Sequence, residues 1–599
     1  MGKKPRKPRT LLVSLPWADH QFPSIQIGSL SAYARKFGFE VDTLHLHLEV
    51  ASYFGLCEYD DIVYIDPHVS ELFFATFLYP NIKKRILKHL SQYVSNVESN
   101  LSRLSKAIKT IYKNTNWKKY DLVGFTVNPQ QLFSSILFAK WLRKDFPHLK
   151  ILFGGPLVTG KLGIDLLKCH PEVDWCVDGE GETAFVGLLK DLSYEAKGAI
   201  KHIPGLIYRR GDQFLINPRR QLLSLKGLPD PDYDHYFRLL DRHPLLQNKE
   251  VMPFLLIESS RGCPYRCAFC MINSYWDGYR IRPPKEVSDQ MKRMSERYHI
   301  NRFRIADSNV PIKSDMQPFS SISKHNCDYN LFFEFRADVN KKELKKMRSA
   351  GVCKILMGIE ALSTNLLSKM NKKTRFIDNL QAMKYCEELG IEHMSNLMLG
   401  LPTESQADID ESVRNIEYAC AYRPPFRIIN FRLGEGAPIF SEPDAYGISD
   451  IKNALPFIKN APCVLKQYDS SNNRRNYRIF YNRYNKWKDE YERSIIDNIK
   501  LLSYYDFKSF LKIEDNRSKI GANGRKIEVV SGIKLAGYAR RLYLFCDSIK
   551  ELPEIKNSFN AVDEIELKKL LNKLVSLKLM YNEGVSYLSL AIHARNSIR

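Results

Sequence analysis

Three cysteines, Cys263, Cys267 and Cys270, lie close together in the order C-x3-C-x2-C. Thiolates on such a short loop can bind three irons of a cubane 4Fe–4S cluster and leave the fourth iron without a protein ligand. The alternative is a zinc site completed by a distant fourth ligand. Zinc sites usually combine paired C-x2-C knuckles, and no second pair occurs in this sequence. Because Phe269 just before the third cysteine also suits a cluster loop, the pattern predicts an iron–sulfur site.

The composition is that of a folded protein of several domains. At 599 residues the chain is too long for one hydrophobic core, and 44% hydrophobic with 26% charged residues excludes a disordered or fibrous protein. Its twelve cysteines are too sparse for a disulfide scaffold, and with one tight cluster they indicate a reducing compartment.

The chain is expected to be cytoplasmic and to have no membrane partner. No apolar stretch approaches the ~20 residues that span a bilayer. The apolar run at residues 11–15 is too short for a signal sequence and predicts a buried strand instead. The net charge of +23 would attract polyanions or acidic peptides.

The N-terminal third alternates strand-like and helix-like patterns, which predicts an α/β fold with a doubly wound parallel sheet. Strands are expected at residues 11–15, 41–46, 121–126 and 150–153, and a helix at 131–146. Ligands of such sheets bind at the carboxyl ends of the strands, where residues 16–23, 126–130 and 154–160 would lie. The pair Gly154-Gly155 allows either close approach of a ligand or a tight turn. The Lys-rich insertion at residues 50–115 is expected to be helical.

A second series of strands and helices follows the cysteine loop, and such a series predicts a barrel or a doubly wound sheet. Its expected strands are residues 254–258, 303–307, 332–338, 355–360, 397–401 and 428–433. Helix-like patterns fall at 341–349, 377–389 and 406–421.

The cysteine loop and this series together resemble the radical S-adenosylmethionine (SAM) superfamily over residues 250–445. The resemblance implies a partial (β/α)6 barrel in which the free iron of a 4Fe–4S cluster chelates SAM. Reductive cleavage then yields methionine and a 5′-deoxyadenosyl radical, with electrons from an external donor of the flavodoxin or ferredoxin type.

The same resemblance implies which residues contact SAM. Gly358 and Glu360 match the Gly-Ile-Glu-Ser segment after the fourth strand, although Ala361 replaces the serine. Gly400 and Pro402, with Glu404, match the Gly-x-Pro-x-Glu turn beside the adenine. On the third strand, Glu334 and Arg336 would hold the carboxylate and ribose groups; the alternative is a structural ion pair.

The N-terminal sheet resembles the cobalamin-binding domain that precedes the barrel in one large radical SAM class. That domain type sometimes carries Asp-x-His-x-x-Gly after its first strand. The corresponding loop here contains His20 without that spacing, and such a histidine is more often a loop residue than a metal ligand. Cobalamin is therefore compatible with the resemblance and left open by the motif.

The C-terminal third is expected to add a helical extension and a winged helix. Residues 446–510 carry aromatic residues among many Lys and Arg, a mixture that could bind nucleic acid. The near-helical spacing of the aromatic residues favours a helix packed on the barrel instead. Helices near 540–550 and 564–577 precede a hairpin at 579–590 with its turn at 582–584. Winged helices bind DNA, but small ones also bind leader peptides.

Four short segments resemble radical SAM maturases of ribosomally synthesised peptides (RiPP), of the proteusin type. They are residues 15–28, the Gly-Glu-Gly-Glu run 179–182, residues 229–234 and residues 587–591. The resemblance implies a precursor peptide whose leader adds a strand to the wing. The expected domains are a cobalamin-binding-like domain at 1–225, a linker at 226–249, the barrel at 250–445, the extension at 446–510 and the winged helix at 511–599.

Three reactions are compatible with these features. The first expectation is L-to-D epimerisation of a peptide, in which Cys463 returns a hydrogen atom to Cα; Cys327 is the other candidate donor. The alternative is cobalamin-dependent C-methylation of a peptide. An RNA-modifying enzyme ranks third, because no RNA-binding module is recognisable, and nucleic acid is therefore disfavoured as a partner.

Overall fold

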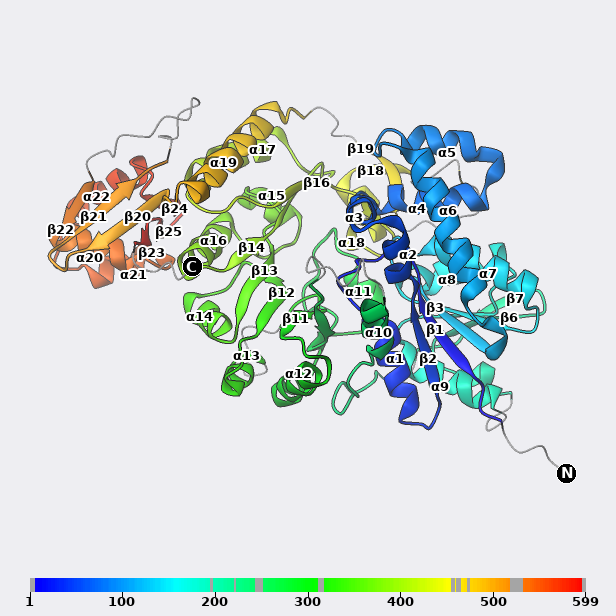
Figure 1. Cartoon of the computed structure of the whole chain (residues 1–599). Coiled ribbons are helices and arrows are strands. Elements are labelled where there is room, and N and C mark those ends of the chain that lie inside the picture. Colours follow the sequence, from blue (N-terminus) through cyan, green and yellow to red (C-terminus); the bar gives the residue numbers. More distant parts are fainter. Residues whose placement is uncertain are drawn as a thin grey trace. The chain divides into compact units, whose positions relative to one another are not determined.

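The computed structural model describes most of the chain (Figure 1). The described residues are 6–193, 198–219, 222–242, 252–310, 317–453, 458, 465–470, 475–517 and 532–594. Cys463, the expected hydrogen donor, lies outside them.

The chain divides into two compact units. The N-terminal unit comprises Met1–Gly262, Ile272–Arg304 and Lys452–Lys466, and the C-terminal unit comprises Cys263–Met271, Ile305–Ile451 and Gln467–Arg599. The five finer domain boundaries stay predictions from the sequence.

The N-terminal unit contains a seven-stranded sheet of order β2-β1-β3-β4-β5-β6-β7 (Figure 1). The strands are β1 Thr10–Ser14, β2 Val41–His45, β3 Leu122–Thr126, β4 Lys150–Gly154, β5 Trp175–Val177, β6 Leu206–Arg210 and β7 Gln213–Ile216. The first five are parallel, and β6 and β7 add an antiparallel edge. This is a doubly wound order, as predicted, and its direction of winding reverses between β1 and β3.

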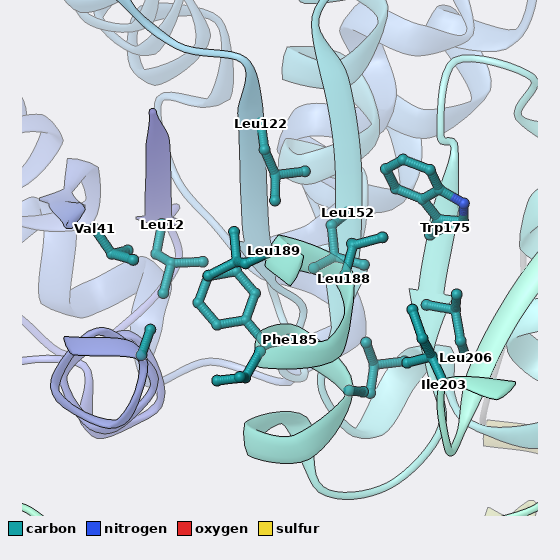
Figure 2. Packing of buried hydrophobic residues seen from close by; sticks show 14 of the residues in the cluster. Leu12, Val41, Leu122, Leu152, Trp175, Phe185, Leu188, Leu189, Ile203 and Leu206 are labelled. Carbon is teal, nitrogen blue, oxygen red and sulfur yellow. The ribbon is translucent and has the colours of Figure 1, made fainter. Parts of the chain in front are cut away.

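The apolar runs of the inner strands are explained by burial on both faces. Every residue of β1 and β3 is buried, as expected where helices cover a parallel sheet on both sides. The covering helices include α1 (Ile25–Arg35), α7 (Leu132–Asp145), α8 (Gly160–Cys169) and α9 (Gly181–Leu192). On one face, Leu12 and Leu152 pack with Phe185 and Leu188 of α9 (Figure 2).

The insertion between β2 and β3 is helical, as predicted. It forms α2 (Leu46–Phe54), α3 (Leu56–Val63), α4 (Pro67–Leu78), α5 (Lys83–Leu90) and α6 (Val97–Asn114). Trp17, in the loop after β1, is buried among Phe54, Tyr59 and Phe73 of these helices. The indole Nε1 donates to the carbonyl oxygen of Ser70 at 2.9 Å, so the insertion holds the loop that follows β1.

Buried histidines in the N-terminal unit predict acid sensitivity. Burial lowers the pKa of His47 to about 4 and that of His235 to about 4, and it lowers the pKa of the adjacent His45 well below its ordinary value. The unfolded chain therefore binds more protons, and stability is lost as pH falls from 6.5 towards 4. For His47 the loss amounts to roughly 3 kcal/mol. We expect the urea concentration at the unfolding midpoint to decrease when the pH is lowered from 7 to 5. His47→Asn should make this decrease smaller, and an equal decrease in the variant and the parent protein would contradict the prediction.

The strand-and-helix series of the barrel is present in the predicted order. In the N-terminal unit it comprises β8 (Leu255–Ile257), α12 (Pro284–Tyr298) and β11 (Arg302–Ile305), whose last residue is assigned to the C-terminal unit. In the C-terminal unit it continues with β12 (Asn330–Arg336), α14 (Lys341–Ser349), β13 (Val352–Gly358), α16 (Phe376–Leu389), β14 (Glu392–Met394), β15 (Asn396–Leu399), α17 (Gln406–Ala419) and β16 (Arg427–Asn430). Strands β12, β13 and β14 run parallel, as do β15 and β16. A parallel bridge from Glu360 to Leu397 joins the two groups.

The expectation of a helical extension over residues 446–510 was too broad. The helix α19 covers only Arg478–Ile496, and β18 (Ile448–Asn453), β19 (Leu465–Ser470) and β20 (Leu502–Asp506) occupy other parts. The reason is that buried aromatic residues recur at helical spacing only on α19, where Tyr484 and Trp487 donate to backbone carbonyls of the barrel. The aromatic face of α19 is thus packed on the barrel, which is the interpretation that the sequence favoured.

The C-terminal residues form a winged-helix arrangement with one more helix than expected. The sheet order is β22-β21-β20-β26, with β21 at Phe510–Asp515, β22 at Ile533–Ala536 and β26 at Ile592–His593. The helices are α20 (Gly537–Phe545), α21 (Leu552–Ser558) and α22 (Glu564–Ser576), and β24 (Met580–Glu583) and β25 (Ser586–Ser589) form the wing. The first helix ends at Phe545 rather than near 550, and α21, with Pro553 in its first turn, follows it. The wing turns at Gly584–Val585 rather than 582–584, since Gly584 takes the positive φ of 62°.

Among the described residues, no helix combines the length and the apolar character that crossing a bilayer requires.

Candidate functional site

The three clustered cysteines lie on one loop of the C-terminal unit, and none forms a disulfide bond with another described residue. Cys267 is buried, and Cys263 and Cys270 are half-buried. Burial raises the pKa of the Cys263 thiol, while the charges of Arg336 and Lys372 act in the opposite direction. Cations beside the loop therefore favour thiolates, and they would also offset the negative charge of a cluster held by three of them.

The geometry of the loop distinguishes a cluster from a single metal ion. In the described part of the chain, no three or more His, Cys, Asp or Glu side chains are placed to hold one ion. A cubane binds each thiolate through a different iron, so its cysteines need not converge on one point. The donor set thus fits an iron–sulfur cluster better than zinc.

Backbone hydrogen bonds hold the cysteine loop in place. The Ala268 N–H donates to the carbonyl oxygen of Met370 at 2.9 Å, and the Ile439 N–H donates to that of Ala268 at 3.0 Å. The Asn371 side chain donates to the carbonyl oxygen of Arg266 at 2.7 Å. The loop is thus tied to residues that follow the fourth barrel strand, and Phe269 packs into the apolar cluster that contains Ile439.

Arg336 lies at the carboxyl end of β12, and one of its guanidinium nitrogens makes no hydrogen bond to a described residue. Its guanidinium carbon lies 3.8 Å from the ring centroid of Tyr265, a residue of the cysteine loop. Nε contacts Asp338 at 3.3 Å and Nη2 donates to the carbonyl oxygen of Lys372. Nη1 is buried and has no hydrogen-bond partner among the described residues. Such a group is costly to leave unpaired, so Nη1 fits an acceptor supplied by a bound cofactor.

Glu360 and Lys372 form an ion pair beside Gly358. The Lys372 ammonium lies 2.9 Å from the Glu360 carboxylate, and the lysine side chain is only 6% exposed. A Cβ on Gly358 would lie 2.6 Å from that ammonium, so glycine at this position leaves room for the pair. Gly358 is also the register partner of Arg336 across β12 and β13. Four residues predicted or found here, Arg336, Gly358, Glu360 and Lys372, therefore gather at one end of these strands.

The turn after β15 is shaped by residues far along the chain. Gly400 has a φ of 82°, and its N–H donates to the buried carboxylate of Glu404 at 2.8 Å. That carboxylate also accepts from Arg475 at 3.1 Å and from the hydroxyl of Tyr477. Glu404 therefore holds the turn containing Gly400 and Pro402. A side chain at Gly400 would meet no atom within 4 Å, which leaves the outer side of the turn open.

Sequence reasoning missed Lys372, Arg475 and Tyr477. No local motif marks them, because each acts on a partner from another strand or turn. Glu334 lies on β12 and is half-buried, and its predicted role is not decided by the geometry. Arg336 forms an ion pair with Asp338, a partner that the sequence analysis did not name, and its Nη1 has no hydrogen-bond partner among the described residues. The predicted contact of Arg336 with SAM stays a prediction.

The N-terminal sheet has a second candidate cofactor surface at its carboxyl edge. Cβ atoms added to Gly154 or Gly160 would meet no atom within 4 Å, so the backbone there is open to a ligand. At Gly155, with a φ of 120°, a Cβ would lie 2.8 Å from the carbonyl oxygen of Val127, so this glycine serves a tight turn. The two interpretations of the glycine pair therefore apply to different residues.

The Nδ1 atom of His20 has a partner within the protein. It lies 2.9 Å from the Asp60 carboxylate of α3, and the imidazole is buried. Burial of the ring is what agrees with a loop histidine, because a carboxylate on Nδ1 is also found beside histidines that bind a metal through Nε2.

Comparison with known proteins gives a match to one domain model and a likeness in fold. The Radical SAM superfamily model matches residues 257–416. An uncharacterised methyltransferase of Pyrococcus horikoshii, PH0819, is 25% identical over 50% of this chain and 66% of its own length. The cobalamin-dependent radical SAM methyltransferase TokK of Streptomyces tokunonensis is 23% identical over 46% of this chain and 42% of its own length.

Among solved structures, the radical SAM enzyme OxsB with aqua-cobalamin and SAM bound is similar with a TM-score of 0.55. It is 16% identical and covers 82% of this chain and 66% of its own, so this likeness shows the fold alone. The chain spans between about two fifths and two thirds of the lengths of these relatives.

Proposed function

Residues 257–416 form a radical SAM domain, and we propose that the protein is a cobalamin-dependent radical SAM enzyme that methylates a carbon atom of a peptide. One observation carries the proposal: a doubly wound sheet, β2-β1-β3-β4-β5, precedes that domain in the chain. Two relatives with methyltransferase names support it. They favour C-methylation, the alternative in the sequence analysis, over the epimerisation expected first.

The chain's own residues bind and orient the cofactors. Cys263, Cys267 and Cys270 would hold the cluster, and Arg336 Nη1 would donate to the carboxylate of SAM. The Glu360–Lys372 pair and the Gly400 turn would border the ribose and the adenine. When bound, the cluster and SAM would supply a carbon-centred radical, and cobalamin would supply the methyl group. An external flavodoxin- or ferredoxin-type donor remains part of the proposal.

Retention of cobalamin tests this proposal most directly. The protein would be reconstituted anaerobically with iron, sulfide and hydroxocobalamin, desalted and examined by absorption spectroscopy. We expect a stoichiometric cobalamin band beside the cluster absorption, and transfer of a trideuteromethyl group from labelled SAM to the peptide, read by mass spectrometry. Cluster absorption with no retained cobalamin would overturn the methylation proposal and leave the radical SAM domain in place.

Bound cobalamin is expected to receive no histidine ligand from the loop after β1. His20 is only 3% exposed, and its loop lacks the Asp-x-His-x-x-Gly spacing of the cobalt-binding histidine. The electron paramagnetic resonance (EPR) spectrum of bound cob(II)alamin should therefore be the same in the parent protein and in His20→Gln. A nitrogen splitting that disappears in His20→Gln would contradict this expectation.

The peptide is proposed to dock by its leader on β22. Among the described residues, this strand lies at the edge of the sheet β22-β21-β20-β26 and pairs with β21 alone. An edge strand presents unpaired backbone groups to an added strand. Lys534 on β22 is exposed, and the net charge of +23 suits an acidic leader.

Charge reversal at the edge strand tests the docking. Lys534→Glu should weaken binding of a fluorescein-labelled precursor peptide by about fivefold, since an exposed ion pair contributes up to about 1 kcal/mol. The matched control is Lys109→Glu, an equal charge change at an exposed position of α6 in the N-terminal unit. Equal anisotropy curves for the two variants would reject β22 as the docking strand.

A further inference from the structure

The Gly-Glu-Gly-Glu run at 179–182 has so far received no function. It follows β5 and leads into α9, and Gly179 adopts a φ of 86°. Its two carboxylates, Glu180 and Glu182, belong to the N-terminal unit and lie against arginines that stand far along the chain. One of these arginines, Arg261, lies on the short strand that precedes the cysteine loop, so the two carboxylates contact that strand.

The Arg261 guanidinium donates hydrogen bonds to three carboxylates. Nη1 donates to Glu180 at 2.9 Å, Nη2 to Glu182 at 2.5 Å and Nε to Glu258 at 2.8 Å. The arginine side chain is only 5% exposed, so the guanidinium is enclosed with one carboxylate on each of its nitrogens. Only the planar, five-donor fork of arginine can make such a set of contacts, because lysine concentrates its donors on one atom.

The clamped arginine stands two residues before Cys263. Ser260–Arg261 forms β9, which pairs with β10 (Arg280–Ile281). Arg280 itself donates to Glu180, so the same carboxylate holds both strands of this ribbon. Between Arg261 and Cys263, Gly262 has a φ of 80°, and a Cβ there would lie 2.2 Å from the carbonyl oxygen of Gly278. The backbone that leads to the first cluster cysteine thus has little freedom to move.

We propose that Glu180 and Glu182 are positioning residues for the iron–sulfur cluster, acting through Arg261 on the segment that carries Cys263. They touch neither cluster nor SAM; they fix the direction in which the chain leaves β9. Residues behind metal ligands commonly set ligand orientation in this way. The inference rests on the radical SAM domain and is independent of whether the reaction is methylation or whether the substrate is a peptide.

A half-buried carboxylate elsewhere in the N-terminal unit provides the matched control. Asp174, just before β5, is half-buried and bonds Arg143 at 2.6 Å and Lys150 at 3.2 Å. It resembles Glu180 in pairing with two cations but contacts neither Arg261 nor Arg280 in these pairs. Asp174→Asn therefore removes a comparable ion-pair network without touching the ribbon before Cys263.

The test compares Glu180→Gln, Glu182→Gln and Asp174→Asn in the full chain after anaerobic reconstitution. The measurements are the thermal midpoint, iron and sulfide per chain, the EPR spectrum of the dithionite-reduced cluster with and without SAM, and SAM cleavage without substrate. We expect both glutamate variants to alter the EPR spectrum and to lose about tenfold in SAM cleavage, the lower end of what changes behind metal ligands cost. Asp174→Asn should lose thermal stability only.

Two outcomes would overturn the proposal. One is an unchanged EPR spectrum and cleavage rate in the glutamate variants; the other is the same loss in Asp174→Asn. Should Glu182→Gln not fold, Glu180→Gln decides alone, because its carboxylate is the more exposed of the two. Cobalamin is left out of the assay, so failure of the methylation proposal does not affect the result.

Discussion

Simultaneous replacement of Cys263, Cys267 and Cys270 by alanine is expected to abolish both the brown colour of the reconstituted protein and its cleavage of SAM. Each thiolate would bind a different iron, so no remaining residue of the loop can take over. The colour reports cluster absorption, and SAM cleavage reports electron delivery from the cluster. Both should disappear together, because one cofactor produces both signals.

Three other cysteines give an equal control. Cys57, Cys169 and Cys327 are exposed and lie away from the loop in sequence. The variant carrying alanine at these positions should retain the parent's iron content, colour and cleavage rate. SAM cleavage that persists in the first variant would refute the cluster assignment, and loss of colour in the control would show that the cluster depends on other thiols.

Arg336→Gln is expected to weaken SAM binding by at least about tenfold. A hydrogen bond to a charged group contributes about 1.5–3 kcal/mol, and Nη1 of Arg336 is buried without a partner in the described part of the chain. Glutamine keeps a polar head but removes the charge and shortens the reach. Equilibrium dialysis of SAM against the reconstituted protein measures the change, with iron content determined on the same samples.

The control for this prediction is Lys345→Gln on α14. Lys345 is exposed, so its change removes one positive charge from the same unit without entering the site. Unchanged SAM affinity in Arg336→Gln would show that Arg336 does not bind SAM and has a structural role, such as its ion pair with Asp338. Loss of iron as well as SAM would indicate that Arg336 supports the loop through Tyr265.

The alternation of strands and helices was readable along the chain because it depends on local patterns. Apolar runs such as residues 11–15 and 121–126 became buried parallel strands, since helices cover both faces of the sheet. Boundaries were read less well where one glycine or proline decides them. Gly584 moves the wing's turn by its positive φ, and Pro553 begins a helix that the apolar pattern did not predict.

The expected extension over residues 446–510 shows the limit of reading composition. Aromatic and basic residues are frequent across the whole segment, yet only Arg478–Ile496 places them at helical spacing and buries Tyr484 and Trp487. The near-helical spacing predicted this helix, whereas the frequency of aromatic and basic residues in the rest of the segment does not specify a period.

By itself, the sequence determined the cofactor chemistry, because the thiolates of Cys263, Cys267 and Cys270 lie within one loop and their spacing is a local property. It also determined the succession of strands that carries Arg336, Gly358 and Gly400 to the ends of the barrel strands. Only the tertiary structure decided which side chains complete the site. Lys372, Arg475 and Tyr477 act on partners 12, 71 and 73 residues away. Contacts across such distances arise from the folding of whole elements onto one another, and no local spacing encodes them.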